Sequence, residues 1–163
     1  MSIKRASRAT KTQPHWLNER EHSAWRALLT MHAQLEARLA SEMKRDANLS
    51  GADYAVLVGL SEAEGQRIRP SELGLELGWE KSRLSKQISR MEDRGLVDRE
   101  ICPTDARGSF VVLTDLGRDT IEAAAPEHAE QVRTWFVTPL TDEQLDQLTS
   151  ISRAIIDHLD AGS

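Results

Sequence analysis

Residues 79–117 constrain the fold most strongly, because they predict a half-buried helix followed at once by two short strands. Within residues 81–94, Leu84, Ile88 and Met91 recur at helical spacing and form one apolar stripe. A glycine directly follows this segment, as is typical of a helix end. We therefore expect a helix over residues 81–94 that buries this stripe against a core and exposes its opposite face.

The opposite face of this helix carries small hydroxyl side chains and cations, with no acid among residues 81–90. At about 100° per residue, the following side chains project away from the apolar stripe or lie at its edge: Ser82, Arg83, Ser85, Lys86, Ser89 and Arg90. Serines permit a close approach, and Arg or Lys can bond guanine edges or phosphates in a DNA major groove. The alternative is that this face is only exposed to solvent, as is the case for most clusters of charged side chains on helices.

The neighbouring segments predict a winged helix. Residues 70–77 form a short helical pattern that begins with proline and ends before a glycine. Residues 96–102 and 109–113 are rich in β-branched side chains, and the turn-forming residues 103–108 separate them. A further short strand is expected at residues 67–69, paired with this hairpin. Two short helices joined around a glycine and followed by a hairpin make a winged helix-turn-helix.

The details of this segment resemble the MarR family of bacterial transcription regulators. The resemblance lies in residues 77–86 (LGWEKSRLSK) and 91–97 (MEDRGLV). It continues in an Asp-x-Arg-Gly wing tip at residues 105–108 and a Leu-Thr-x-x-Gly exit at residues 113–117. A helix-turn-helix signal alone is common, whereas this combination at this spacing is fairly specific.

The resemblance implies a homodimeric, sequence-specific DNA-binding regulator, and within that family a ligand-responsive repressor. Such a dimer would bind double-stranded DNA at a palindromic operator, through the helix at 81–94 and the wing at 97–113. The alternative is a winged-helix protein-interaction module without specific DNA binding. Such a module would be expected to lack the basic outer face of the helix at 81–94, which this chain keeps. The sequence contains no recognisable catalytic motif, so neither enzyme activity nor a cofactor is expected.

Arg107 is the most informative residue of the predicted wing. Narrow A·T-rich minor grooves concentrate negative potential, and an arginine at a wing tip can enter such a groove beside the operator core. The alternative is an ion pair with Asp105 that stiffens the turn, and the two are compatible because the carboxylate can orient the guanidinium. In the MarR family the wing-tip arginine contacts DNA, so the resemblance implies this role for Arg107, supported by Asp105.

The flanking segments predict long helices with uncovered apolar stripes. Helical spacing runs from residue 15 to about residue 45, and a second stripe follows residues 145–159. One winged-helix domain is too small to cover both stripes, so we expect a partner surface. The predicted organisation is a flexible tail at 1–13, a winged-helix DNA-binding domain at 49–117, and a helical dimerisation region at 14–48 and 118–163.

Polar residues and one proline predict where the other helices begin and end. Ser50 with Asp53, and Thr141 with the glutamine three positions later, have the spacing of N-terminal capping boxes. Thr114 is expected to cap the helix that follows the wing. Pro126 lies within that helix and is expected to kink or break it. These signals, with strands only around the wing, indicate a mostly α fold.

Three tryptophans in the flanking helices raise the question of a small-molecule site. Trp16, Trp25 and Trp135 could line a cavity between the first and fifth helices, where the MarR family often binds aromatic effectors. The alternative, which we favour, is burial in a core or interface, because tryptophans bury large apolar areas there. The resemblance thus implies a small aromatic effector without assigning its contacts.

The composition argues against a membrane, secreted or metal-binding protein. The 163 residues are 39% hydrophobic and 29% charged, and no apolar run is long enough to span a membrane. The N-terminus lacks the apolar core of a signal peptide, so a cytoplasmic protein is expected, associated with the bacterial nucleoid when bound to DNA. The single cysteine, Cys102, excludes an intramolecular disulfide, and the 5 scattered histidines indicate no metal site.

Overall fold

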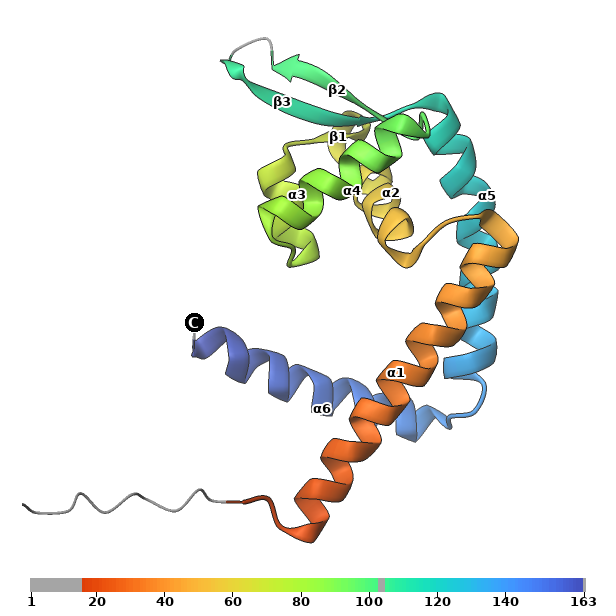
Figure 1. Ribbon diagram of the computed structural model, residues 1–163. Helices are drawn as coiled ribbons and strands as arrows, with labels where there is room; N and C mark the ends of the chain where they lie inside the picture. Colours follow the sequence, from red (N-terminus) through yellow and green to blue (C-terminus); the bar gives the residue numbers. More distant parts are fainter. Residues whose placement is uncertain (1–15, 103–104, 163) are drawn as a thin grey trace, which may run out of the picture. The chain divides into compact units, whose positions relative to one another are not determined.

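The computed structural model describes residues 16–102 and 105–162, with the side chains of 102 and 105–108 outside the description. The predicted tail at 1–13 also lies outside the described residues. The chain is mostly helical with one small antiparallel sheet, as expected (Figure 1). The elements in chain order are α1 (Glu19–Ala47), α2 (Gly51–Glu62), the 3-10 helix η1 (Glu64–Gln66), β1 (Arg67–Ile68), α3 (Pro70–Leu77), α4 (Lys81–Asp93), β2 (Val97–Cys102), β3 (Asp105–Leu113), α5 (Asp115–Val132), the π-helical turn η2 (Arg133–Val137) and α6 (Asp142–Ala161). In the described part of the chain, no helix is both long and apolar enough to cross a membrane.

The chain divides into two compact units, Met1–Gln34 and Leu35–Ser163. The first unit contains the beginning of α1, which starts at Glu19 rather than near residue 15 as predicted. The later start has a local cause, because Asn18 Oδ1 accepts a hydrogen bond from the N–H of Glu21 at 3.0 Å and Glu21 accepts one from the N–H of Asn18 at 2.8 Å. From residue 16 onward, the large apolar side chains of this unit are exposed: Trp16, Leu17, Trp25, Leu28, Leu29 and Met31.

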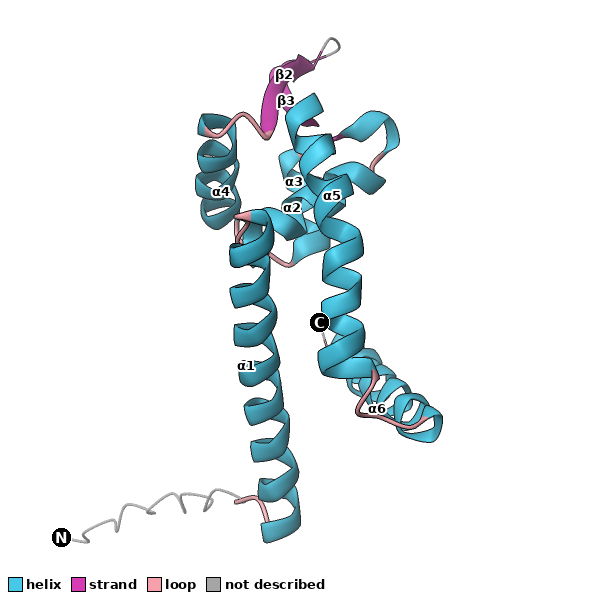
Figure 2. Ribbon diagram, turned by 90° about the vertical axis from the view of Figure 1, so that its right-hand side faces the viewer, coloured by secondary structure: helices cyan, strands magenta, loops and turns pink. Residues whose placement is uncertain are grey.

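The core of the second unit lies where α2, α3, α4 and the sheet meet. Its most completely buried side chains are Leu49, Val56, Leu57, Leu60, Leu73, Leu84, Ile88, Met91 and Val111. Burial of each such aliphatic side chain contributes about 1.5–3 kcal/mol, so this cluster holds the winged helix together. In Figure 2, α2 and α3 lie on one side of α4, and the hairpin of β2 and β3 stands at the end of this group.

The helix-turn-helix closely follows the predicted boundaries. Helix α3 begins with Pro70, whose missing N–H is not needed in a first turn, and ends at Gly78 in a left-handed conformation with φ of 62°. Helix α4 follows after a short turn, and Gly95, with φ of 70°, lies just beyond its end. Its apolar stripe is buried as predicted. The capping box predicted for α2 is also present, between Ser50 and Asp53.

The wing is an antiparallel hairpin of β2 and β3, and β1 pairs with the other edge of β3. Arg67 lies opposite Val112, which confirms the short strand expected near this position. Strand β3 begins at Asp105, so the turn predicted over residues 103–108 was too long. Ladder pairing uses only backbone N–H and C=O groups, so it continues past the β-branched residues on which the prediction relied. The register becomes irregular after Ile101.

Helix α5 leads away from the wing. Thr114 caps it as predicted, accepting from the N–H of Gly117 at 2.9 Å, and its hydroxyl donates to the carbonyl of Gly95 at 2.7 Å. The helix continues through Pro126, so it does not break there, and the kink that was the other expectation stays a prediction. A proline removes one backbone donor and crowds one carbonyl, and the helical hydrogen bonds on either side of it suffice here. Thr141 caps α6 with the predicted capping box.

Gly117 lies so close to the base of the wing that it has no room for a side chain. A Cβ atom there would lie 2.0 Å from the carbonyl oxygen of Leu96 and 2.9 Å from Cδ1 of Leu113. We expect Gly117→Ala to lower the free energy of unfolding by roughly 1–3 kcal/mol, because the backbone must move to relieve the overlap. Urea unfolding followed by circular dichroism measures this loss. Gly51→Ala is the matched control, since a Cβ there meets no atom within 4 Å; equal losses in both variants would contradict the prediction.

Candidate nucleic-acid interface

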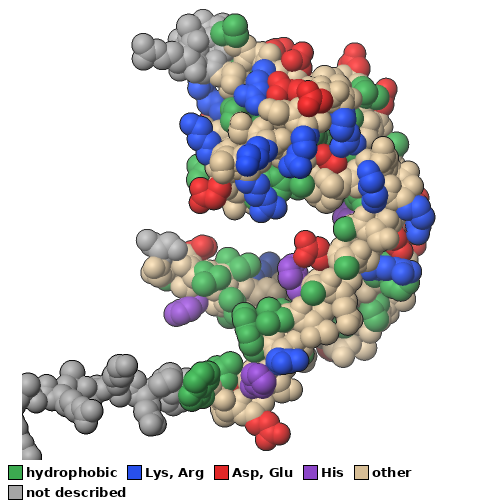
Figure 3. All heavy atoms as spheres, in the orientation of Figure 1, with side chains coloured by type: hydrophobic (Ala, Val, Ile, Leu, Met, Phe, Trp, Pro, Cys, Tyr) green, Lys and Arg blue, Asp and Glu red, His purple; other side chains and the backbone are tan. Residues whose placement is uncertain are grey.

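Helix α4 exposes the face that the sequence predicted for DNA contact. Leu84, Gln87, Ile88 and Met91 are buried. The predicted contact residues of this helix are all exposed: Ser82, Arg83, Ser85, Lys86, Ser89 and Arg90. In Figure 3, Lys and Arg side chains gather over α4 on the face toward the viewer. The side of the helix that a DNA groove could approach is therefore cationic and rich in small hydroxyl groups.

Arg83 is supported on this face by an aromatic ring. Its guanidinium carbon lies 4.2 Å from the centroid of Trp79, in the turn before α4. Trp79 is itself partly buried against the core. A cation–π contact of this kind is worth about 0.5–1 kcal/mol at an exposed site, and it leaves the N–H groups at the edge of the guanidinium free to donate. The stack therefore holds Arg83 near the first turn of α4.

An open groove of about 830 Å³ lies beside this helix. Residues of α3, α4 and the sheet line it, together with one acid, Glu80, in the turn before α4. Its cationic and hydroxyl-bearing lining residues are Arg69, Ser71, Lys81, Ser85, Arg99 and Ser109. These side chains carry cations or hydroxyl groups, which suit a phosphate backbone. The groove thus continues the cationic surface from α4 toward the base of the wing.

Several side chains attach the base of the wing to its surroundings. Arg99 of β2 donates to the carboxylate of Glu92 at 3.0 Å, which joins the wing to the last turn of α4. The guanidinium carbons of Arg67 and Arg69 lie 5.1 and 5.2 Å from the ring centroid of Phe110. The wing is therefore joined to α4 by an ion pair, and to β1 and the start of α3 by cation–π contacts, in addition to the backbone.

The predicted wing-tip residues belong to the hairpin, but their side chains lie outside the description. The backbone of Asp105 and Arg107 lies in β3. Their ion pair and their contact with DNA therefore stay predictions. The thiol of Cys102 likewise lies outside the described side chains.

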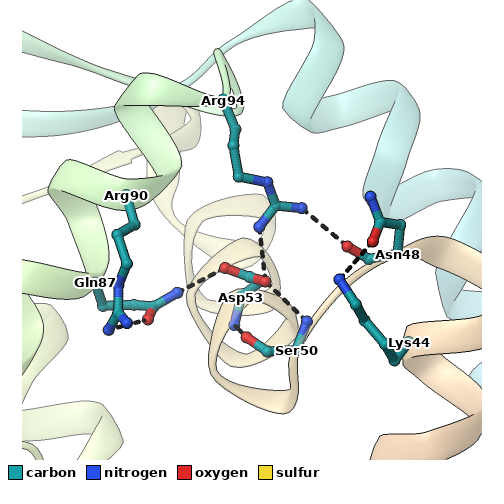
Figure 4. Close-up of polar contacts among 7 residues, drawn as sticks. All are labelled: Lys44, Asn48, Ser50, Asp53, Gln87, Arg90 and Arg94. Carbon is teal, nitrogen blue, oxygen red and sulfur yellow. Dashed lines mark hydrogen bonds and ion pairs between the residues drawn. The ribbon is translucent and has the colours of Figure 1, made fainter.

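Beneath the exposed face, Asp53 ties α2 to α4 (Figure 4). Its carboxylate accepts from Nε2 of Gln87 at 2.6 Å, from Nη1 of Arg94 at 2.8 Å and from the N–H of Ser50 at 2.8 Å. Arg94 also donates from Nη2 to the carbonyl oxygen of Asn48 at 3.0 Å, so the junction between α1 and α2 joins the same network. Burial by itself would raise the pKa of Asp53, but the hydrogen bonds from Ser50 and the Arg94 guanidinium outweigh it and hold that pKa below its ordinary value.

The sequence predicted Asp53 only as a capping residue, and its two long-range partners, Gln87 and Arg94, were not expected. Gln87 lies three positions after Leu84 and four before Met91, so helical spacing could have placed it on the buried face. A polar side chain at such a position needs a buried partner. Arg94, by contrast, looked like an ordinary cation in the last turn of a helix, and no local signal distinguishes it.

The tryptophans do not lie in a core of the single chain, so that part of our interpretation was wrong. Trp16 is 82% exposed, Trp25 51% and Trp135 42%. The indole N–H of Trp135 donates to Glu42 at 2.9 Å, and the guanidinium carbon of Arg38 lies 4.0 Å from one of its ring centroids. Their predicted part in an effector pocket stays a prediction.

A cavity of about 280 Å³ lies between the C-terminal part of α1 and helix α5. Its lining residues are Met43, Asp46, Ala47, Thr120, Ala123, Ala124, Glu127, His128 and Gln131. Within the described part of the chain, buried Nδ1 of His128 and Oε1 of Gln131 have no hydrogen-bond partner. Burial lowers the pKa of His128, which favours the neutral imidazole. Across residues 16–102 and 105–162, no three or more His, Cys, Asp or Glu side chains cluster closely enough to hold a metal ion.

Comparison with known proteins defines the class to which this fold and surface belong. Residues 47–108 match the model of the MarR family. AbsC, a MarR family transcriptional regulator from Streptomyces coelicolor, is 40% identical in sequence, and the match covers 91% of this chain and 99% of AbsC with a TM-score of 0.85. The chain therefore belongs to the MarR family of transcriptional regulators, which confirms the resemblance seen in the sequence.

Two further relatives extend the comparison. Sco3205, a MarR family transcriptional regulator from Streptomyces coelicolor solved in complex with DNA, is 37% identical, with 90% of this chain and 92% of Sco3205 covered and a TM-score of 0.85. The transcriptional repressor MprA from Escherichia coli strain K12 is 29% identical over 136 residues, which are 81% of this chain and 75% of MprA. All three relatives are transcriptional regulators.

The Asp53 network predicts a pH dependence of stability. Because the pKa of Asp53 in the folded chain lies below its unfolded value of about 3.9, its contribution is complete above that pH and is lost as the pH falls through the folded-state pKa. Asp53→Asn removes the titrating group, so its free energy of unfolding should lie below that of the wild type at neutral pH. The difference should shrink below about pH 4.

Urea unfolding at a series of pH values measures this difference. Asp157→Asn, which removes an exposed carboxylate of α6, controls for the loss of one charge. A difference between wild type and Asp53→Asn that stays constant down to about pH 3 would contradict the prediction.

Proposed function

We propose that this protein is a homodimeric, sequence-specific DNA-binding transcription regulator that acts as a ligand-responsive repressor at a palindromic operator. The observation that carries the proposal is α4, which buries its apolar face and exposes a cationic, hydroxyl-bearing one. The recognition helix of a winged helix-turn-helix enters the major groove with such a face. The complex of Sco3205 with DNA, at 37% identity, supports this assignment.

Within this interface, α4 and the wing have different roles. Arg83, Lys86 and Arg90 bond base edges or phosphates, and the serines at 82, 85 and 89 permit the backbone to approach the groove. Arg107 enters the flanking minor groove, where Asp105 orients its guanidinium. The helix thus supplies most of the sequence discrimination, and the wing supplies affinity through the electrostatic potential of the groove.

A second copy of the chain is the partner that the exposed apolar faces require. Helix α6 exposes four large apolar side chains by 50–62%: Ile151, Ile155, Ile156 and Leu159. A two-fold dimer would cover such faces and present two recognition helices to the two halves of a palindrome. We accordingly assign residues 14–48 and 118–163 to dimerisation and residues 49–117 to DNA binding.

A small aromatic effector would control binding by changing the separation of the two recognition helices. This is a population shift between a state that fits the operator and one that does not. The alternative function, a protein-interaction module, gives no reason for the exposed cations of α4. We propose no enzymatic role, and we place the protein's action in the cytoplasm, on the nucleoid when it is bound to DNA.

Fluorescence anisotropy with a palindrome from the gene's own upstream region tests the proposal. The wild type should bind the palindrome more tightly than a scrambled duplex and should sediment as a dimer at micromolar concentration. Lys86→Ala should weaken binding by roughly 1–3 kcal/mol, the worth of one base contact, without changing the free energy of unfolding. Arg133→Ala, which removes an exposed cation of η2 that pairs with Glu130, is the matched control. Wild-type affinity in both Lys86→Ala and Arg83→Ala would exclude α4 from recognition.

The wing makes a different prediction, because a minor-groove arginine gains mainly from electrostatic potential. Arg107→Ala should lower the affinity for all palindrome variants by a similar factor and flatten the log–log salt dependence by about one unit. Asp105→Ala should give a smaller version of this defect, since it frees the arginine without removing it. Titrations over a range of salt concentrations measure both effects. Relaxed discrimination at one central base pair, with an intact salt slope, would show that the wing reads bases directly.

A further inference from the structure

Gln87 is a polar residue on the buried face of α4, whose other buried residues are apolar. It is only 5% exposed and lies between Leu84 and Met91 along the stripe. A leucine or methionine there would bury apolar area without the cost of removing an amide from water. The hydrogen bonds of this amide therefore indicate what the residue does.

These bonds give the amide a single orientation. Nε2 donates to Oδ1 of Asp53 at 2.6 Å, and because a carboxylate can only accept, the amide cannot be reversed. Its other end, Oε1, accepts from Nη2 of Arg90 at 3.1 Å. Figure 4 shows this chain of bonds running from Asp53 on α2, through Gln87, to Arg90 on α4.

Asp53 is a firm anchor for this chain. The N–H of Ser50 and Nη1 of Arg94 both bond its other oxygen, Oδ2, at 2.8 Å. Arg94 is in turn bonded to the carbonyl oxygen of Asn48 at 3.0 Å. The carboxylate is thus fixed by the cap of α2 and the end of α4, and Oδ1 is directed at Gln87.

We propose that Gln87 is a positioning residue of the DNA interface, which holds the guanidinium of Arg90 ready for a phosphate or base edge. The proposal rests on the DNA-binding function proposed above and deepens it. A long arginine on an exposed helix face samples many rotamers, and one that is held before binding loses less conformational entropy when the complex forms. Lys86 is exposed on the same helix and lies outside the bonds described for this chain, so it serves as a comparison.

A double-mutant cycle separates positioning from a purely structural role. Gln87→Met removes both bonds and keeps an unbranched side chain of similar length. Operator affinity should fall about two- to tenfold, as for a lost hydrogen bond, and this loss should disappear in an Arg90→Ala background. In a Lys86→Ala background the two losses should add. Anisotropy with the palindrome measures affinity, and urea unfolding measures stability in the same variants.

Exchanging the carboxylate of residue 53 with the amide of residue 87 tests the same idea without changing the volume of the buried side chains. In Asp53→Asn alone, the glutamine amide must turn over to accept from the new amide, so it no longer presents an acceptor to Arg90. This variant should therefore lose affinity as Gln87→Met does. Adding Gln87→Glu restores an acceptor for Arg90, keeps the net charge and lets the new amide donate to the new carboxylate. The double variant should recover affinity to within about twofold of the wild type, less than the effect of one hydrogen bond.

Two results would overturn the proposal. One is a Gln87→Met loss that persists in full in the Arg90→Ala background, because Gln87 would then act on the packing of α4 as a whole. The other is an exchanged pair that binds as weakly as Asp53→Asn alone, which decides the matter even if Gln87→Met does not fold. Failure of the proposed function has a separate signature: the wild type would not prefer the palindrome over the scrambled duplex, and the inference would fall with it.

Discussion

The buried carboxylate of Asp53 is the interaction on which the placement of α4 depends. A carboxylate with 5% exposure is costly unless it is paired, and here it receives hydrogen bonds from Ser50, Gln87 and Arg94. The apolar contacts of α4 supply most of the stabilisation, but they are non-directional and would tolerate a small rotation or slide of the helix. Hydrogen bonds to one carboxylate from Gln87 within α4 and from Arg94 at its C-terminal end restrict both movements. The same group caps α2, so the two helices share one anchor.

The wing is attached to this anchored helix at its base. Thr114 bonds the carbonyl of Gly95, directly after α4, and Arg99 pairs with Glu92 in the last turn of the helix. Gly117 allows α5 to start in close contact with the same region. The base of the wing and the end of α4 are therefore joined by direct contacts, as suits a protein that contacts two neighbouring grooves of the same duplex.

Membership of the MarR family gives the remaining features a common explanation. Helix α6 and the first unit expose many large apolar side chains, which soluble monomers rarely do. A second copy of the chain would cover them. The cavity between α1 and α5, with unpartnered His128 and Gln131 atoms among the described residues, lies away from α4. An effector of the kind proposed above, bound there, would not cover the exposed face of α4.

The sequence by itself determined the local features of this protein. The caps at Ser50, Thr114 and Thr141 and the proline start of α3 depend on residues within a few positions, so spacing and residue type suffice. The exposed face of α4 follows equally from helical periodicity. Only the tertiary structure decided that Gln87 would be buried against a carboxylate 34 positions away. Such pairings depend on how whole elements pack, because the partner is brought near by the core and not by the chain between them. The predicted start of β3 was too late for the same reason. Local β-propensity does not show where a strand begins, because pairing with the opposite strand decides this.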